Sequence, residues 1–121
     1  MTRVLVVDDN QLIRESIRKL ISPEPGWEVC GEATNGLEAV QMAAKLKPDV
    51  VLLDFQMPIM NGLDAAKALI KDNASIPIAM YTLHQNTYFE KEARAAGVRK
   101  VISKMDVFSA LVPNLRELVT S

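Results

Sequence analysis

Three carboxylates, one hydroxyl and one ammonium group stand directly or closely after short apolar stretches of this chain. These residues are Asp8, Asp9, Asp54, Thr82 and Lys104. If the fold brings the carboxylates together, two unit charges ~4 Å apart cost on the order of 4 kcal/mol at an effective dielectric near 20. A cation is then needed to offset the repulsion, and oxygen-only ligands suit Mg2+. The single histidine and the single cysteine stand outside this set, which disfavours zinc.

Together these groups match the needs of phosphoryl transfer to a carboxylate. One carboxylate attacks phosphorus and forms an acyl phosphate. The metal ion, the Lys104 ammonium and the Thr82 hydroxyl neutralise the phosphoryl oxygens. Asp54 is the predicted nucleophile, because it ends the central predicted strand, between the other groups.

The apolar patterns predict alternating strands and helices. Short, mostly β-branched runs predict strands at 4–7, 27–31, 50–53, 76–82 and 101–102. Helical spacing of apolar residues predicts helices at 13–21, 37–46, 63–70, 87–96 and 111–119. This order predicts an α/β fold, a doubly wound five-stranded parallel sheet in the order 2-1-3-4-5 with helices on both faces, flavodoxin-like (βα)5. We expect residues 1–121 to form one such domain.

The predicted strand order gathers the chemical groups at one edge of the sheet. Ligands of open α/β sheets bind beyond the carboxyl ends of the strands, where the strand order switches. Taken alone, each group has an ordinary structural role, since Asp9 or Asn10 could cap the first helix and Lys104 could be a solvated charge. Their coincidence at one edge favours a functional site.

Composition bounds the class of protein. The chain is 49% hydrophobic and 24% charged, which is typical of a globular domain. Its formal net charge of -1 gives no basic surface for nucleic acid. Cys30 cannot form an internal disulfide, and we expect it to be a small buried strand residue. The apolar run at 4–7 is too short for a secretion signal, so we expect a cytoplasmic protein without a membrane span.

The stretch 54–62 reads D-x-x-M-P-x-M-x-G. It resembles the sequence around the phosphorylated aspartate of response-regulator receiver domains in two-component systems. The acidic pair at 8–9, Thr82, and Lys104 seven residues after Gly97 extend the resemblance over essentially the whole chain. The resemblance implies a phospho-accepting signalling switch rather than an enzyme. The donor to Asp54 would be a phosphohistidine on a partner kinase, and the new phosphoryl group would change the partner-binding or dimerisation surface.

The same resemblance implies a metal site. Mg2+, or Mn2+ in its place, would be held by Asp9, Asp54 and the backbone carbonyl of Gln56, with Asp8 acting mainly through water. The segment 81–84, with a non-proline after Lys104, is also similar to receivers of transcription regulators that carry a C-terminal helix-turn-helix. In such regulators the last two helices and the fifth strand often form a homodimer. An output domain of that kind would lie outside these 121 residues.

The sequence departs from the family pattern beside the lysine. Val101 stands where an aromatic residue is usual, and a valine has no ring to rotate when the site is phosphorylated. We hypothesise that Tyr88 or His84 fills the space. The resemblance implies another role for His84, since its position lies beside the phosphoryl group, where it could orient water. The remaining alternative is that His84 is an exposed loop residue.

Two further positions concern the backbone. Met105 replaces the proline that usually follows the lysine, so we expect a trans bond or a strained loop there. Pro113 lies inside the last helical stripe, where it kinks the helix unless the helix begins near Ala110 and places the proline in its first turn.

Other classes of protein fit the pattern less well. A phosphatase of the haloacid-dehalogenase kind also uses an aspartyl phosphate, but it places an acid two residues after its nucleophile, and here that position after Asp8 is Asn10. A non-phosphorylated interaction module would not need the complete acidic set. A flavin or nucleotide site is disfavoured because no glycine-rich loop follows the first strand.

Overall fold

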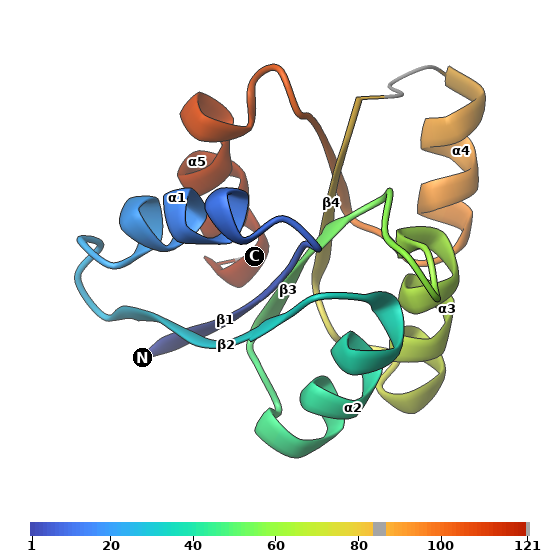
Figure 1. Ribbon diagram of the computed structural model, residues 1–121, viewed down its shortest axis with the longest axis horizontal. Helices are drawn as coiled ribbons and strands as arrows, with labels where there is room; N and C mark the ends of the chain where they lie inside the picture. Colours follow the sequence, from blue (N-terminus) through green and yellow to red (C-terminus); the bar gives the residue numbers. More distant parts are fainter. Residues whose placement is uncertain (84–86, 121) are drawn as a thin grey trace.

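The computed structural model describes residues 1–83 and 87–120 and has a sheet between two layers of helices (Figure 1). The strands are β1 Thr2–Val7, β2 Trp27–Ala33, β3 Val50–Asp54, β4 Ile78–Thr82 and β5 Lys100–Ser103. The helices are α1 Gln11–Ile21, α2 Gly36–Leu46, α3 Gly62–Asp72, α4 Thr87–Ala95 and α5 Val107–Thr120. None of the helices in the described part of the chain is long and apolar enough to cross a membrane.

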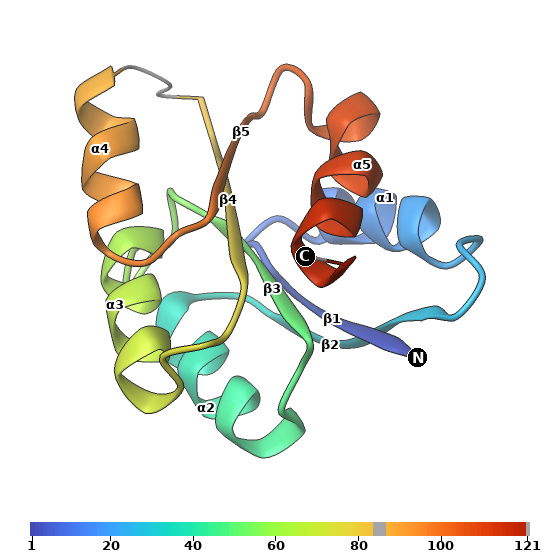
Figure 2. The same ribbon diagram turned by 180° about the vertical axis from the view of Figure 1, so that it is seen from behind.

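The sheet is parallel and has the order β2-β1-β3-β4-β5, which confirms the predicted doubly wound topology. Helices α1 and α5 cover one face, and α2, α3 and α4 cover the other (Figure 2). Successive residues of a strand point to opposite faces. In β3, Val51 and Leu53 therefore join the core under α2, α3 and α4, whereas Val50 and Leu52 join the core under α1 and α5. This two-sided burial is why β3 and β4 are uniformly apolar until their last residues.

Asparagine side chains begin three of the helices. Asn10 accepts hydrogen bonds from the N–H groups of Leu12 and Ile13, and Asn35 and Asn61 cap α2 and α3 in the same way. Asn10, rather than Asp9, therefore caps α1. Only Asp8 and Asp9 separate β1 from the cap Asn10, and only Thr34 separates β2 from the cap Asn35, so these two loops at the carboxyl edge of the sheet are short.

The structure corrects two local predictions, for Cys30 and Pro113, and agrees with two others. Cys30 is half-buried rather than buried, and it lies where the register between β1 and β2 shifts by one residue. Pro113 lies well inside α5, because the helix begins at Val107, so the alternative of a start near Ala110 is wrong. The Lys104–Met105 peptide bond is trans. The predicted helix stop at Gly97 is confirmed, since this residue has a φ of 105° just after α4.

Candidate functional site: an acidic edge of the sheet

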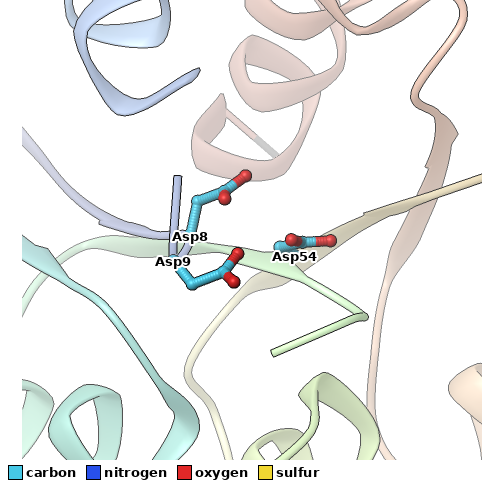
Figure 3. Close-up of side chains that lie close together, drawn as sticks. All are labelled: Asp8, Asp9 and Asp54. Carbon is cyan, nitrogen blue, oxygen red and sulfur yellow. The ribbon is translucent and has the colours of Figure 1, made fainter. Parts of the chain in front are cut away.

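Three carboxylates meet at the carboxyl edge of the sheet. Asp8 and Asp9 follow β1, and Asp54 is the last residue of β3 (Figure 3). One oxygen from each lies within 4.8 Å of the others. Asp8 and Asp54 are only 2% and 1% exposed, whereas Asp9 is exposed to solvent. Because every donor is a carboxylate oxygen and one side is open to water, the set fits a hard divalent ion bound directly or through water.

A lysine that directly follows β5 compensates one of these charges. Lys104 Nζ lies 2.8 Å from Asp54 Oδ1, and the N–H of Gln56 donates to the same oxygen at 3.2 Å. The Lys104 N–H also donates to the Thr82 carbonyl at 2.9 Å, so the end of β4 holds the lysine backbone in place. The ion pair therefore joins the end of β3 to the segment after β5.

Burial dominates the titration of both inner carboxylates. It raises the pKa of Asp54, and the Asp8 charge adds to the effect, although the hydrogen bond and charge of Lys104 partly oppose it. Burial likewise raises the pKa of Asp8, with hydrogen bonds from Tyr81 and Asn10 acting in the other direction. Without a cation, the folded site therefore stabilises the charged carboxylates less than water does.

Asp8 is held on several sides. The Asn10 N–H donates to its Oδ1 at 2.8 Å, and the Tyr81 hydroxyl donates to its Oδ2 at 2.6 Å. Arg14 Nη1 donates to its backbone carbonyl at 2.7 Å, and Arg14 Nε donates to Glu32 at 3.0 Å. These contacts fix both the side chain and the backbone of Asp8 against α1 and β2.

The loop after Asp54 depends on a close backbone approach. The Gly62 N–H donates to the Phe55 carbonyl at 2.8 Å, and a Cβ on Gly62 would lie 2.6 Å from the Asp54 carbonyl oxygen. Only glycine therefore lets α3 begin this near the acidic edge. The same loop holds Ile59 at a φ of 69°, a left-handed conformation that is costly for a β-branched residue.

The acidic groups open into a cleft of about 420 Å³. Its lining residues are Asp8, Asp9, Asn10, Ile13, Asp54, Gln56, Tyr81, Lys104 and Phe108. Of the predicted site residues, only Thr82 is not part of this lining. Thr82 is fully buried at the end of β4, at the same edge of the sheet.

The structure adds residues that were not predicted as site residues. Tyr81 and Arg14 both bond to Asp8, and Phe108 lines the cleft from α5. A signal for Tyr81 was present, since it is a polar aromatic residue in an apolar strand directly before Thr82. Arg14 lies one helical turn after Asn10, but its contact with Asp8 depends on a side-chain conformation that spacing does not determine.

The neighbourhood of Val101 differs from the hypothesis. Tyr88 is 74% exposed and does not fill the space beside Val101, and His84 lies outside the described residues. Phe89 of α4 packs instead against the same core as Val101. Its ring meets that of Phe55 edge-on, with centroids 4.7 Å apart and planes at 79°. An aromatic contact thus links α4 to the residue after Asp54.

A doubly wound sheet with clustered carboxylates and a lysine at its carboxyl edge defines a flavodoxin-like domain built to bind a cation and an anionic group. A family model described as the response regulator receiver domain matches residues 4–116, and the chain belongs to that family. It is a receiver domain of the two-component response regulators, a phosphoacceptor switch. Receiver domains take phosphoryl groups from histidine kinases and pass the signal to partners.

Known proteins place this domain in several contexts. A protein-glutamate methylesterase/protein-glutamine glutaminase of Pyrococcus abyssi is 39% identical over 116 residues, which are 96% of this chain and 31% of the relative. The response regulator GacA of Pseudomonas viridiflava is 34% identical over 96% of this chain and 54% of the relative. The chain therefore spans about a third of the first relative and about half of the second.

Solved structures agree with this assignment. The crystal structure of the response regulator domain of Thermotoga maritima CheB matches with a TM-score of 0.92 and 31% identity, covering 100% of this chain and 98% of that one. The signal receiver domain of the putative response regulator NarL from Mycobacterium tuberculosis matches with a TM-score of 0.92 and 27% identity, covering 99% and 97%. Both matches extend over the complete sheet and its helices.

Proposed function

We propose that Asp54 is the phosphoacceptor of this receiver domain. A carboxylate oxygen of Asp54 attacks the phosphorus of a phosphohistidine, and the P–N bond breaks as the P–O bond forms. The electron pair of the broken bond stays on the imidazole nitrogen, which takes up a proton. Lys104 and Thr82 bind the phosphoryl oxygens and neutralise the charge on them. The observation that supports these roles is the ion pair between the buried Asp54 and the partly exposed Lys104, beside two further carboxylates.

We propose Mg2+ as the ion of the acidic edge, with Mn2+ as a substitute. Asp9, Asp54 and the backbone carbonyl of Gln56 would hold it, and Asp8 would bind it through water. When bound, the ion supplies positive charge to the phosphoryl oxygens and offsets the repulsion among the carboxylates. The all-oxygen donor set and the open side at Asp9 support this choice of metal.

The proposed role of residues 1–121 is that of one regulatory receiver domain rather than an enzyme acting on an external ester. The relative named a methylesterase is about three times the length matched here, and GacA is named a response regulator, so the proposed domain regulates a further domain of a longer protein. The proposed donor is a histidine kinase. Because that kinase needs ATP, the proposed compartment is the cytoplasm.

We further propose that the output surface lies on α4, β5 and α5 and that it forms a homodimer. Two exposed apolar side chains there support this proposal, Tyr88 on α4 and Met105 before α5. Sedimentation of the protein with and without beryllofluoride, which stands in for the phosphoryl group, tests it. A monomer under both conditions contradicts it.

Incubation with acetyl phosphate and Mg2+, followed by intact mass spectrometry, tests the phosphoacceptor. We expect one added phosphoryl group in the natural protein and none in Asp54→Asn. Asp72→Asn removes an exposed carboxylate at the far end of α3 and should be modified normally. Modification of Asp54→Asn, or steady turnover of a generic phosphate ester, contradicts the proposed function.

A further inference from the structure

We propose that Tyr81 is a positioning residue for the cation site, which it serves by fixing the Asp8 carboxylate and the Lys104 ammonium at the same time. This inference rests on the proposed function, because it concerns the geometry of the proposed Mg2+ site. Tyr81 is not part of the motif that identifies the family. It contacts two members of the proposed site, Asp8 and Lys104.

Tyr81 reaches the site from inside the core. It is the largest fully buried side chain, 1% exposed, and its ring packs in the core under α1 and α5. Its backbone pairs with Asp54 in the register between β3 and β4, and its carbonyl accepts the N–H of Phe55. A phenol buried this deeply needs a hydrogen-bond acceptor. The acceptors are Asp8 Oδ2 at 2.6 Å and, at the longer distance of 3.4 Å, the Val7 carbonyl.

The contact with Asp8 does more than satisfy a buried hydroxyl. Asp8 Oδ1 already accepts the N–H of Asn10, so the tyrosine supplies the donor to the other oxygen. Donors on both oxygens restrict rotation of the Asp8 carboxylate, which lines the cleft. A phenol is protonated at neutral pH, so the Tyr81 hydroxyl is the donor in this hydrogen bond and the Asp8 carboxylate is the acceptor.

The same ring also faces the lysine. Lys104 Nζ lies 5.7 Å from the centroid of the Tyr81 ring, within the range of a cation–π contact. Lys104 is thus held by the ring on one side and by Asp54 on the other. Tyr81 therefore holds the Asp8 carboxylate of the proposed cation site and the Lys104 ammonium, which is proposed to bind the phosphoryl group, at a fixed distance from each other.

Substitution of Tyr81→Phe tests the hydroxyl alone, because the ring and its contact with Lys104 are retained. We expect the Kd of the unphosphorylated protein for Mg2+, measured by calorimetry, to rise on the order of tenfold, as is typical when a group that orients a metal ligand is removed. Ser75→Ala is the control, since it removes a hydroxyl from an exposed residue before the opposite end of β4, and its Kd should match that of the natural protein. A residue with a merely structural role would lower the melting temperature of the metal-free protein without changing the Kd.

Two results would overturn the inference and have different meanings. If the natural protein binds Mg2+ and Tyr81→Phe binds it equally well, the positioning role is wrong and the proposed function stands. If the natural protein binds no Mg2+, both fail.

A second measurement needs no variant and decides the matter if Tyr81→Phe does not fold. In proton NMR spectra of the natural protein, the buried Tyr81 hydroxyl should give a slowly exchanging resonance that shifts as Mg2+ is added, with the same Kd. A hydroxyl resonance that does not respond to Mg2+ contradicts the positioning role.

Discussion

Lys104 and Asp54 form an ion pair of 2.8 Å between two strand ends that are 50 residues apart in the chain. The carboxylate is buried, while the lysine is partly exposed. The ammonium contacts the same oxygen of Asp54 as the N–H of Gln56, so in the proposed mechanism it lies beside the incoming phosphoryl group. The pair therefore prepares the positive charge before phosphorylation begins, without further movement of the backbone.

Lys104→Met tests this arrangement, since methionine keeps much of the side-chain volume and removes the charge. We expect phosphorylation by acetyl phosphate to slow on the order of a hundredfold, the usual cost of losing one donor to a developing charge. Lys91→Met removes an exposed lysine on α4 and should leave the rate unchanged. The measurement is the rate of mass increase at saturating Mg2+. A normal rate in Lys104→Met would remove the lysine from the mechanism.

Asp8→Asn should stabilise the metal-free protein at neutral pH. Burial raises the pKa of both Asp8 and Asp54, so folding favours their protonated forms. Their contribution to stability is therefore fully present below the unfolded pKa and is lost as the pH rises through the folded pKa. Removing the Asp8 charge should raise the free energy of unfolding by roughly 1–3 kcal/mol at pH 7. The reason is that the carboxylate oxygens of the cluster lie within 4.8 Å of one another, and two unit charges at that distance repel by about 3 kcal/mol at an effective dielectric of 20.

Urea denaturation with a chelator present measures this change. The exposed Asp72→Asn variant, which lies away from the cluster, should leave the free energy of unfolding unchanged. Added Mg2+ should stabilise the natural protein more than Asp8→Asn, which narrows the difference between them. A loss of stability in metal-free Asp8→Asn would mean that the Tyr81 and Asn10 hydrogen bonds outweigh the repulsion.

The sheet order and the acidic edge could be predicted from the sequence because strand ends follow from apolar runs. The apolar run from Val50 to Leu53 is buried on both faces of the sheet, and the first polar residue, Asp54, marks the end of the strand. The parallel strand order then determines which strand ends lie next to one another. The contact of Tyr81 with Asp8 could not be predicted in this way. It joins residues 73 positions apart and depends on the length of a phenol reaching from the core to the edge.

The error near Val101 has a similar cause. Tyr88 and Phe89 are adjacent, and a helix turns successive side chains by about 100°, so only one of them can face the sheet. The sequence alone does not show which of the two rings faces the sheet. In the structure, Phe89 packs against the core and Tyr88 is exposed. Pro113 was misplaced because a helix start is hard to predict without an asparagine cap of the kind that marks α1, α2 and α3.

Phe89→Ala should weaken the response of α4 to phosphorylation, because Phe89 contacts Phe55, the residue after the proposed phosphoacceptor Asp54. We expect the free energy of unfolding to fall by roughly 1–3 kcal/mol, less than for a fully buried phenylalanine. The phosphorylation rate should stay near that of the natural protein, while the amide chemical-shift changes of α4 on adding beryllofluoride should shrink. Leu37→Ala, which removes an exposed apolar side chain from α2, is the control. An undiminished α4 response in Phe89→Ala contradicts a coupling role for the aromatic pair.

Ile59→Gly should stabilise the loop after Asp54. Ile59 has a φ of 69° and is 78% exposed, so it bears the strain of a left-handed backbone without burying its side chain. Relief of that strain should contribute ~1–2 kcal/mol, partly offset by the greater flexibility of glycine in the unfolded chain. Ile59→Ala keeps the Cβ and should show little gain. Urea denaturation compares the two variants, and equal stability would exclude backbone strain at this position.

Pro113→Ala should stabilise α5, because a proline inside a helix has no N–H and its ring collides with the preceding turn. The carbonyl of Ser109, four residues earlier, loses its helical donor for this reason. Pro113 is exposed, so alanine removes no core packing, and we expect the free energy of unfolding to rise by ~1–3 kcal/mol. Pro113→Gly restores the N–H but not the helix propensity, and its gain should be smaller by about 1 kcal/mol. If Pro113→Ala were no more stable than the natural protein, the helix would have to bend enough at this position to absorb the ring, and the cost assigned to the proline would be wrong.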